Sequence, residues 1–596
     1  RVCSGQQESG SACVSSRGNY GVVSLRDWLP VGVDEYGYVA PDPLNPDIVY
    51  GGRNVTRFDR RTGQVSSVGP IAGRGGGGGA PGTFRQVRTM PVVFSEVDKR
   101  SLFFANNHLW KTVNGGESWS QISPDLTRQT WTTPKSVGKY TSMQGAQSSQ
   151  RGVIYTVAPS YQEINRVWVG TDDGLIHVTA DGGKTWKDVT PPALTPWAKV
   201  SLIDAGRFSA QTAYAAINTL RLDDLRPHIY RTKDGGQTWT EIVNGLPPGG
   251  IVNAVREDPQ RRGLLFAGTE QAVYVSFDDG DSWQSLRLNM PATSIRDLVV
   301  KDTDLVVGTH GRGFWILDDI SPLRQITADI ARVDAFLFRP STAWRFRWNQ
   351  NTDTPLPPDE PAAPNPPDGV TISYLLGPGV RGSVTLEIID TVTGDTLRRY
   401  TSDDPEDPPV AGRNIPDYWI RPAQRLSAAP GLHRFVWDGR YAPPPVDRVS
   451  YPIAAVAGNT PKTPRGMWVA PGTYQVRLTA GGKSLRQPIV VRMDPRVRTS
   501  TADLALQFKL SKSLDDMMRQ LARARTEIAK QLEGSSGAPA TRLQAQIAAL
   551  QQATAPMVSL FESIQRADAR PTAAQEAAAV DLIKKAEAAI AASKEG

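Results

Sequence analysis

One short phrase occurs four times in the first half of the chain and constrains its fold more than any other feature. The copies share the pattern Ser/Thr-x-Asp/Asn-x-Gly-x-Ser/Thr-Trp and lie at Thr112–Trp119, Thr179–Trp186, Thr232–Trp239 and Ser276–Trp283. Each copy stands between two short runs of strand-forming residues. Self-similarity of this kind is typical of repeat folds, in which small units stack side by side. The repeat therefore predicts the architecture of residues 1–320.

Short apolar segments recur through the same region, with polar loops and tight turns between them. Their spacing is roughly 45–60 residues including loops, which is close to one blade of a β-propeller. They are the expected first strands of seven units and lie at Val2–Ser4, Ile48–Gly51, Leu102–Ala105, Val167–Gly170, Ala213–Ile217, Leu264–Gly268 and Leu305–Gly308. We therefore expect a mainly β chain that begins with a propeller of about seven blades.

The repeated turn has a structural role of its own. A carboxylate or amide at its third position can accept hydrogen bonds from the backbone amides of the turn. The following glycine supplies the positive φ of a tight hairpin, and the closing tryptophan buries an apolar face. Asn114 keeps the hydrogen bonding without the charge, which suits a cap and not a catalytic acid. The residues expected to be structural are Asn114, Trp119, Asp181, Trp186, Asp234, Trp239, Asp278 and Trp283.

The second half of the chain changes composition twice. A segment dense in proline, Asn349–Asp368, predicts a linker, and the period-two strands that follow it predict a small β-sandwich. After it, Leu510, Leu514 and Met517 begin a pattern at helical spacing, which predicts two or three amphipathic helices in a hairpin or coiled coil. The expected domains are a propeller at 1–345, a linker at 346–369, a sandwich at 370–498 and a helical tail at 499–596.

Composition narrows the choice of partners and compartment. The net charge is +7 over 596 residues with no dense basic run, so we expect no nucleic-acid site. No apolar run approaches the length of a membrane span. Cys3 and Cys13, the two cysteines of the chain, lie opposite each other on an expected hairpin. A disulfide there would indicate an oxidising compartment, and two buried free thiols are the alternative.

The chain begins at Arg1 in an expected strand, with neither an initiator methionine nor a signal peptide. We expect either processing or a longer parent protein. An upstream propeller or a partner chain would then complete the first blade, and Ala335–Phe338 is another segment that could fill it.

The four turns identify a resemblance. They match the Asp-box (BNR) signature, and residues 1–320 resemble the propeller proteins that carry it, which include sialidases, tandem-propeller xyloglucanases, sortilin-type VPS10 domains and photosystem II assembly factors. The run at 308–318 is most similar to large secreted bacterial proteins of the glycosyl-hydrolase or VPS10-like group. Phe435–Gly439 and Pro471–Tyr474 resemble the Ig-like domain of the flagellar hook-capping protein. The resemblance implies a fold and a secreted, periplasmic or cell-surface location, but it leaves the function open.

Strand order predicts where a site would lie. The repeated turns join the third and fourth strands of a blade, so the loops between the second and third strands must open on the opposite face. Those loops supply an expected ligand-binding rim at the channel mouth, made by His108, Asp172, Glu270, His310 and Arg312. A different interpretation of the last residue is that Arg312 pairs with Asp318 or Asp319 to lock the last blade. Asp173-Gly174 is expected to be a hairpin turn.

Two functions remain. We expect a non-catalytic binding or scaffold propeller for a protein partner or an extracellular glycan. The alternative is a glycoside hydrolase of the xyloglucanase type, which needs two carboxyl groups facing each other across a cleft. Glu8, Asp172 and Glu270 are the candidate catalytic carboxylates, taken as pairs from different blades. The sequence predicts no cofactor and no metal site, and the glycine run at 75–79 reads as a loop and not as a phosphate cradle.

Overall fold

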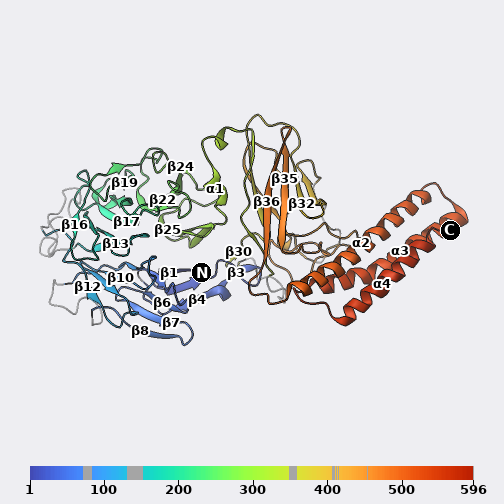
Figure 1. Cartoon of the computed structure of the whole chain (residues 1–596), viewed down its shortest axis with the longest axis horizontal. Helices are drawn as coiled ribbons and strands as arrows, with labels where there is room; N and C mark the ends of the chain where they lie inside the picture. The colour runs from blue at the N-terminus through green and yellow to red at the C-terminus, as the bar shows by residue number, and fades with distance from the viewer. Residues whose placement is uncertain are drawn as a thin grey trace. The chain divides into compact units, whose positions relative to one another are not determined.

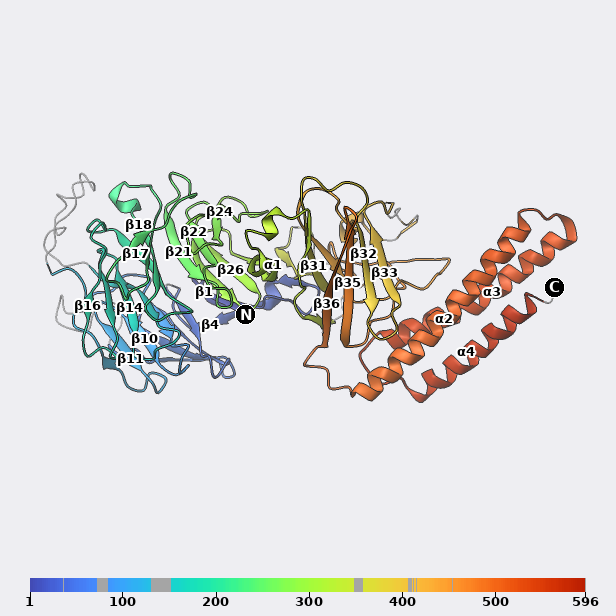
Figure 2. The same cartoon turned by 45° about the horizontal axis from the view of Figure 1, so that its top comes forward.

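The computed structural model describes residues 1–35, 37–71, 84–129, 152–347, 357, 359–405, 410, 412–413, 415–452 and 454–594. The glycine run at 75–79 lies outside these residues. The chain forms two compact units. The first contains residues 1–16 and 26–326, and the second contains residues 17–25 and 327–596. Figures 1 and 2 label their elements.

The first unit is a succession of small antiparallel sheets, each made from one stretch of chain. Its strands, sheet by sheet, are β1 (Val2–Gln6), β2 (Gly10–Val14) and β4 (Trp28–Val31); β5 (Val39–Pro41), β6 (Ile48–Gly51), β7 (Thr56–Asp59) and β8 (Gln64–Ser67); β9 (Val92–Phe94), β10 (Leu102–Ala105), β11 (Leu109–Thr112) and β12 (Ser120–Gln121); β13 (Ile154–Pro159), β14 (Val167–Thr171), β15 (Ile176–Thr179) and β16 (Lys187–Asp188); β17 (Lys199–Ala205), β18 (Ala213–Asn218), β19 (His228–Thr232) and β20 (Thr240–Glu241); β21 (Val252–Glu257), β22 (Leu265–Thr269), β23 (Val273–Ser276) and β24 (Gln284–Ser285); and β25 (Ile295–Lys301), β26 (Asp304–Thr309) and β27 (Phe314–Leu317). Short helices η1 (Leu25–Asp27), η3 (Leu220–Leu222) and α1 (Ser321–Gln325) complete the list.

These sheets are arranged as the blades of a β-propeller. The first strand of each sheet contacts the first strand of the next, in the order β1, β5, β9, β13, β17, β21 and β25. The second strands β14, β18 and β22 are buried along their whole length, whereas the fourth strands β16, β20 and β24 are exposed. Apolar side chains therefore fill the space between neighbouring sheets, as expected for radially packed blades.

The repeated turns join the third and fourth strands and tie each sheet to the one before it. Asp181 accepts hydrogen bonds from the Thr179 hydroxyl, the Thr185 hydroxyl and the Thr185 backbone amide. The Trp186 indole donates to the carbonyl of Ile122, in the preceding sheet, at 2.9 Å. The other three copies repeat the indole contact, and Asp234 and Asp278 repeat the acceptor pattern. Asn114 accepts from the Thr112 hydroxyl and the Ser118 amide but donates to the Ser118 hydroxyl.

The first and last sheets each have three strands. Trp28 on β4 stacks on Phe314 of β27 with ring centroids 6.1 Å apart, so side chains of these two sheets meet. Cys3 and Cys13 face each other across β1 and β2 and form a disulfide. The segment Ala335–Phe338 was one expected filler of the first blade. That expectation is wrong, because β28 (Ala335–Leu337) pairs with β31 in a sheet of the second unit.

The second unit contains two sheets that share one apolar core. One sheet has the order β28, β31 (Val370–Leu376), β34 (Gly431–Trp437), and the other has β29 (Ala343–Arg345), β36 (Lys483–Met493), β35 (Gly472–Ala480), β32 (Thr385–Asp390), β33 (Thr396–Thr401). A two-stranded ribbon, β3 (Val22–Ser24) with β30 (Ala362–Pro364), brings residues 17–25 into this unit. Two short helices are η4 (Ile330–Arg332) and η5 (Asp417–Trp419). Buried Trp437 and Tyr374 lie in the shared core.

Three long helices end the second unit, α2 (Thr501–Leu532), α3 (Gly537–Gln565) and α4 (Ala573–Ala592). The Ser500 hydroxyl caps α2, and Thr572 with Gln575 forms a capping box at α4. The tail thus has three helices, each in contact with the other two, which is within the expected two or three. None of the described helices is apolar over the length that a bilayer crossing requires. Residues 327–345 group with the second unit, and the domain limits expected at 345, 369 and 498 stay predictions.

Candidate functional site

A cluster of charged side chains lies on the propeller face opposite the repeated turns. Four first strands carry a β-bulge near the end that opens on this face, with Tyr155, Ser201, Asn253 and Arg296 as the extra residues. A bulge turns a side chain away from the regular alternation of a strand. Lys199 begins its strand next to one of these bulges.

Lys199 is the central cation of the cluster. Its ammonium lies 4.6 Å from the centroid of the Tyr155 ring, a cation–π contact across two sheets. Burial and the nearby charges of Arg221 and Arg296 lower the pKa of Lys199, Asp172 and Glu270 oppose the change, and the resulting pKa is about 8. Within the described residues, no carboxylate forms an ion pair with Lys199.

Asp172 lies in the loop after β14, and its side chain is mostly buried. One carboxylate oxygen accepts from the Val153 amide at 2.9 Å, and the other lies 3.7 Å from the Arg221 guanidinium. Burial raises the pKa of Asp172 above its ordinary value, and the like charge of Asp173 adds to this effect. Asp172 is therefore the carboxyl group of the cluster that most resists ionisation.

Glu270 lies in the corresponding loop two sheets further along the chain. It accepts from Asn253 at 3.0 Å and from Arg296 at 3.2 Å. Burial opposes ionisation of Glu270, but the interactions with Ser294 and Asn253 and the charges of Arg296 and Lys199 outweigh it and hold its pKa below the ordinary value. The same Arg296 contacts Nδ1 of His310 at 3.1 Å.

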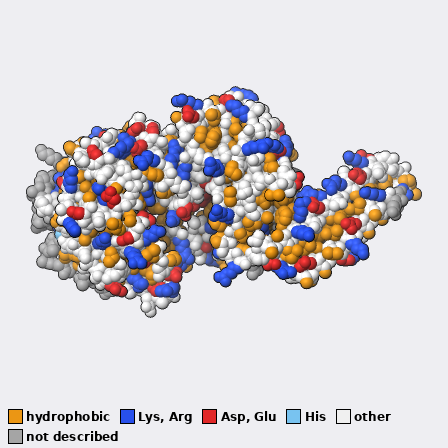
Figure 3. Space-filling model, viewed as in Figure 1, with side chains coloured by type: hydrophobic (Ala, Val, Ile, Leu, Met, Phe, Trp, Pro, Cys, Tyr) orange, Lys and Arg blue, Asp and Glu red, His pale blue; other side chains and the backbone are white. Residues whose placement is uncertain are grey.

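The cluster has more positive than negative charge. Lys199, Arg221 and Arg296 stand against Asp172 and Glu270, and burial favours the neutral form of Asp172. The side chains of Arg221 and Arg296 are 40% and 44% exposed, so both guanidinium groups can reach a ligand. The surface in view in Figure 3 mixes basic and acidic side chains. The cluster can therefore bind an anionic group through a local excess of charge.

The structure joins some of the predicted rim residues and separates others. Asp172 and Glu270 both act on Lys199, and Glu270 and His310 share Arg296. His108 contacts a different group of residues, with Nδ1 near the Ser123 carbonyl and the Gln121 amide. Glu8 and Arg312 are exposed turn residues. The Glu8 amide donates to Glu35, and the Arg312 amide donates to Thr309. Asp173 is buried and accepts from the Thr171 hydroxyl and the Arg128 amide, as a structural turn residue would.

Sequence reasoning missed the three cations as a group. Arg221 lies in η3, in the loop between β18 and β19, whereas Lys199 and Arg296 lie on first strands whose positions were not predicted. Lys199 gave a sequence signal, because it begins a mostly apolar strand, whereas Arg296 is followed directly by Asp297 and Arg221 lies outside the strands. The β-bulges near these strand ends have no recognisable pattern in the amino-acid sequence.

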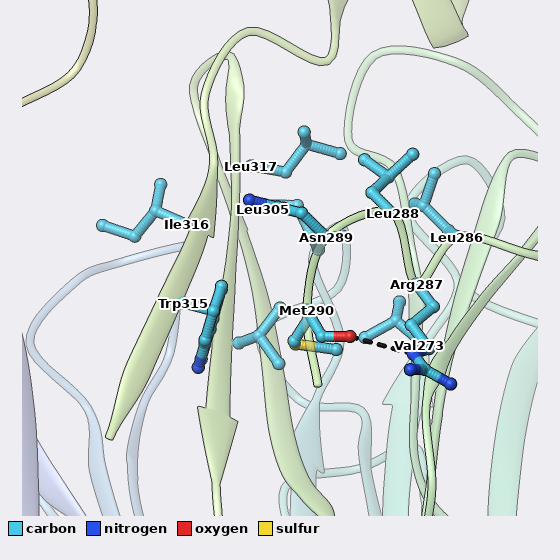
Figure 4. Close-up of a pocket in the computed structure, with 11 residues that line it drawn as sticks. Val273, Leu286, Arg287, Leu288, Asn289, Met290, Leu305, Trp315, Ile316 and Leu317 are labelled. Carbon is cyan, nitrogen blue, oxygen red and sulfur yellow. Dashed lines mark hydrogen bonds between the residues drawn. The ribbon is translucent and has the colours of Figure 1, made fainter. Parts of the chain in front are cut away.

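A second feature of the propeller is a shallow apolar cavity of about 50 Å³ between the last two sheets. Leu286, Leu288 and Met290 line one side, and Trp315 and Leu317 line the other (Figure 4). The Arg287 side chain bridges this loop by donating to the Met290 carbonyl at 2.9 Å. The cavity has neither the volume nor the polar groups of a small-molecule site.

Comparison with known proteins yields structural likeness alone. No family model and no curated protein matches the sequence. The GH74 xyloglucanase from Xanthomonas campestris is 15% identical, with 83% of this chain and 81% of the enzyme covered at a TM-score of 0.37. YCF48 bound to a D1 peptide is 16% identical, with 49% and 78% covered at 0.27. Virginiamycin B lyase from Staphylococcus aureus, an inactive variant with quinupristin, is 9% identical, with 53% and 94% covered at 0.35. Similarity this distant gives no information on activity or ligand.

Proposed function

We propose that the first unit is a non-catalytic binding propeller and that the cluster around Lys199 binds an anionic group of a protein or glycan partner. The observation that carries the proposal is the ammonium of Lys199, which lies over Tyr155, is affected by the charges of two partly exposed arginines and forms no ion pair with a carboxylate of the described residues. A partly buried cation without a carboxylate partner is costly unless a ligand offsets its desolvation. An acidic peptide or an acidic polysaccharide supplies that charge.

The finer description of the chain belongs to the same proposal. The first unit would be a seven-bladed Asp-box (BNR) propeller of the glycosyl-hydrolase or VPS10-like type, and the sheets of the second unit would form an Ig-like sandwich. The turn motifs and the strand order support this description. The protein would act in the periplasm, outside the cell or at its surface, where a disulfide between Cys3 and Cys13 is stable.

The test uses the whole chain and two defined acidic probes, a poly-glutamate peptide and polygalacturonate. Lys199→Met should weaken binding of one of them by roughly tenfold, the effect of removing one charge-assisted contact. The matched control is Lys187→Met, because Lys187 is an exposed lysine on the outer strand β16. Binding that both substitutions weaken equally, or no binding of either probe, would contradict the proposal.

A glycoside hydrolase remains a second candidate because of one observation. The pKa values of Asp172 and Glu270 are displaced in opposite directions, upward for Asp172 by burial and downward for Glu270 by its donors and cations. Such a pair could divide the roles of general acid and of base or nucleophile. Hydrolysis of xyloglucan that falls at least a hundredfold in both Asp172→Asn and Glu270→Gln would establish this alternative over the binding function.

A further inference from the structure

The last propeller sheet lacks a part that the four sheets before it possess. The sheet of β25, β26 and β27 ends at β27, whereas the preceding sheets add a fourth strand beyond the third. In those sheets the fourth strand follows a tryptophan. Among the described residues, β27 pairs with β26 alone, so its other edge is an unpaired strand edge. Residues 314–317 on this strand are all half-buried.

Each of the four tryptophans enters the same position in the preceding sheet. The indoles of Trp119, Trp186, Trp239 and Trp283 donate to the carbonyls of Val68, Ile122, Val189 and Ile242 at 2.5, 2.9, 2.7 and 2.8 Å. Every acceptor is the residue directly after a fourth strand. The amide of each acceptor donates back to a carbonyl in its own sheet, either of the residue just before the third strand or of one of the first two residues of that strand.

Leu286 is the fifth residue of this series. It directly follows β24, and its amide donates to the Val273 carbonyl at 2.9 Å, as in the other four sheets. No indole donates to the Leu286 carbonyl within the described chain. The apolar cavity of Figure 4 lies at this point, and we call Leu286, Leu288, Met290, Trp315 and Leu317 the Leu286 socket. The socket is therefore the one position of the series that still lacks its tryptophan in the described residues.

We propose that the last sheet is completed in trans by an extended segment of a partner polypeptide that carries the Ser/Thr-Trp pair of the repeated turn. Its strand would pair with β27 opposite Trp315 and Ile316, because Tyr274 and Val275 hold the equivalent places in the preceding sheet and pair with β24. Its indole would enter the Leu286 socket and donate to the Leu286 carbonyl. Addition of a strand to a sheet edge is an established mode of peptide recognition.

The shallow socket suits this occupant. Trp119, Trp186 and Trp239 are only half-buried in their own positions, so the indole needs a ledge with one acceptor and not an enclosed cavity. Leu288 is 66% exposed at the socket edge, although a leucine gains free energy from burial. Main-chain pairing would give affinity, and the indole would give specificity.

A peptide with the sequence of residues 234–242, which contains the tryptophan turn of another sheet, is the probe. Fluorescein-labelled peptide is titrated with the whole chain and followed by anisotropy. We expect saturable binding and binding roughly tenfold weaker for the same peptide with alanine in place of tryptophan, since burial of the ring and its hydrogen bond are lost. Amide hydrogen exchange of residues 314–317 should slow when the peptide binds. Equal binding of the two peptides, no saturable binding, or unchanged exchange would overturn the proposal.

A surface substitution locates the peptide without disturbing the core. Leu288→Asp should weaken binding at least tenfold, while Leu44→Asp, at a leucine that is 57% exposed in the loop between β5 and β6, should leave it unchanged. Sedimentation velocity tests whether a second copy of the chain covers the β27 edge instead. If the chain alone forms dimers that Leu288→Asp dissociates, and the peptide does not bind, a second copy and not a tryptophan peptide covers this edge, and the proposal is wrong.

Discussion

The surroundings of the Lys199 ammonium make its charge depend on pH near neutrality. Burial and two neighbouring arginines lower its pKa to about 8, so the group loses its proton in weakly alkaline solution. Binding of the acidic probe should therefore weaken as pH rises through about 8. Arginine stays protonated over this range, so Lys199→Arg should bind with little pH dependence. Titrations of the probe between pH 6.5 and 9.5 check both statements, and a parallel decline of the two proteins would contradict the role of Lys199.

Glu257 is a buried acid that makes stability depend on pH. Burial, helped by the charges of Asp204 and Asp279, outweighs the hydrogen bonds from the Arg207 and Gly263 amides and raises its pKa from 4.5 to about 7. The native state then binds more protons than the unfolded state between pH 4.5 and 7, so stability falls as pH rises through that window. Glu257→Gln should remove a loss on the order of 3 kcal/mol, measured by urea unfolding at pH 5 and pH 7.5. A variant with the wild-type pH slope would exclude this carboxyl as the cause.

At the scale of elements, the tryptophan turn is an inter-sheet tie whose strength follows its burial. Trp283 is 4% exposed and donates to Ile242, so Trp283→Ala should destabilise the propeller by about 3–5 kcal/mol. Trp283→Phe keeps most of the apolar contact but leaves the carbonyl without its donor, which costs about 1–3 kcal/mol. The less buried Trp186 should show smaller effects for both changes. Guanidinium unfolding followed by circular dichroism measures the series, and equal losses at the two sites would contradict the burial argument.

The same elements show how far the sequence could predict the fold. Apolar runs that end in recognisable turns are local signals, so Ile48–Gly51 and Leu102–Ala105 have the predicted bounds. Their expected place as first strands is wrong, because each is the second strand of its sheet. The turn chemistry of Asp181 is local and was equally readable. The place of residues 17–25 in the second unit could not be predicted, because their pairing with β30 joins segments more than three hundred positions apart in sequence.

The candidate site was predicted only in part, for a related reason. Asp172 and Glu270 come from loops whose direction follows from strand order, so their face of the propeller could be inferred. Lys199 and Arg296 reach the same place through first strands and their bulges. A bulge depends on pairing with a neighbouring strand, and a single sequence does not reveal that pairing.

The whole molecule has two sets of cores. Every apolar core among the described residues lies entirely in the first unit or entirely in the second. Cooperative unfolding follows shared cores, so we expect two thermal transitions in calorimetry. A substitution within the propeller should then shift one transition and leave the other unchanged.

Removal of the disulfide between Cys3 and Cys13 tests whether the two units unfold independently. It closes a loop with a sequence separation of 10 in the first sheet, and its loss should cost about 3 kcal/mol through the entropy of the unfolded chain. Spread over a unit of roughly 300 residues, that loss lowers the melting temperature by about 4 °C. The double variant Cys3→Ser with Cys13→Ser should therefore shift the propeller transition and leave the second transition in place. Equal shifts of both transitions would show that the two units unfold as one.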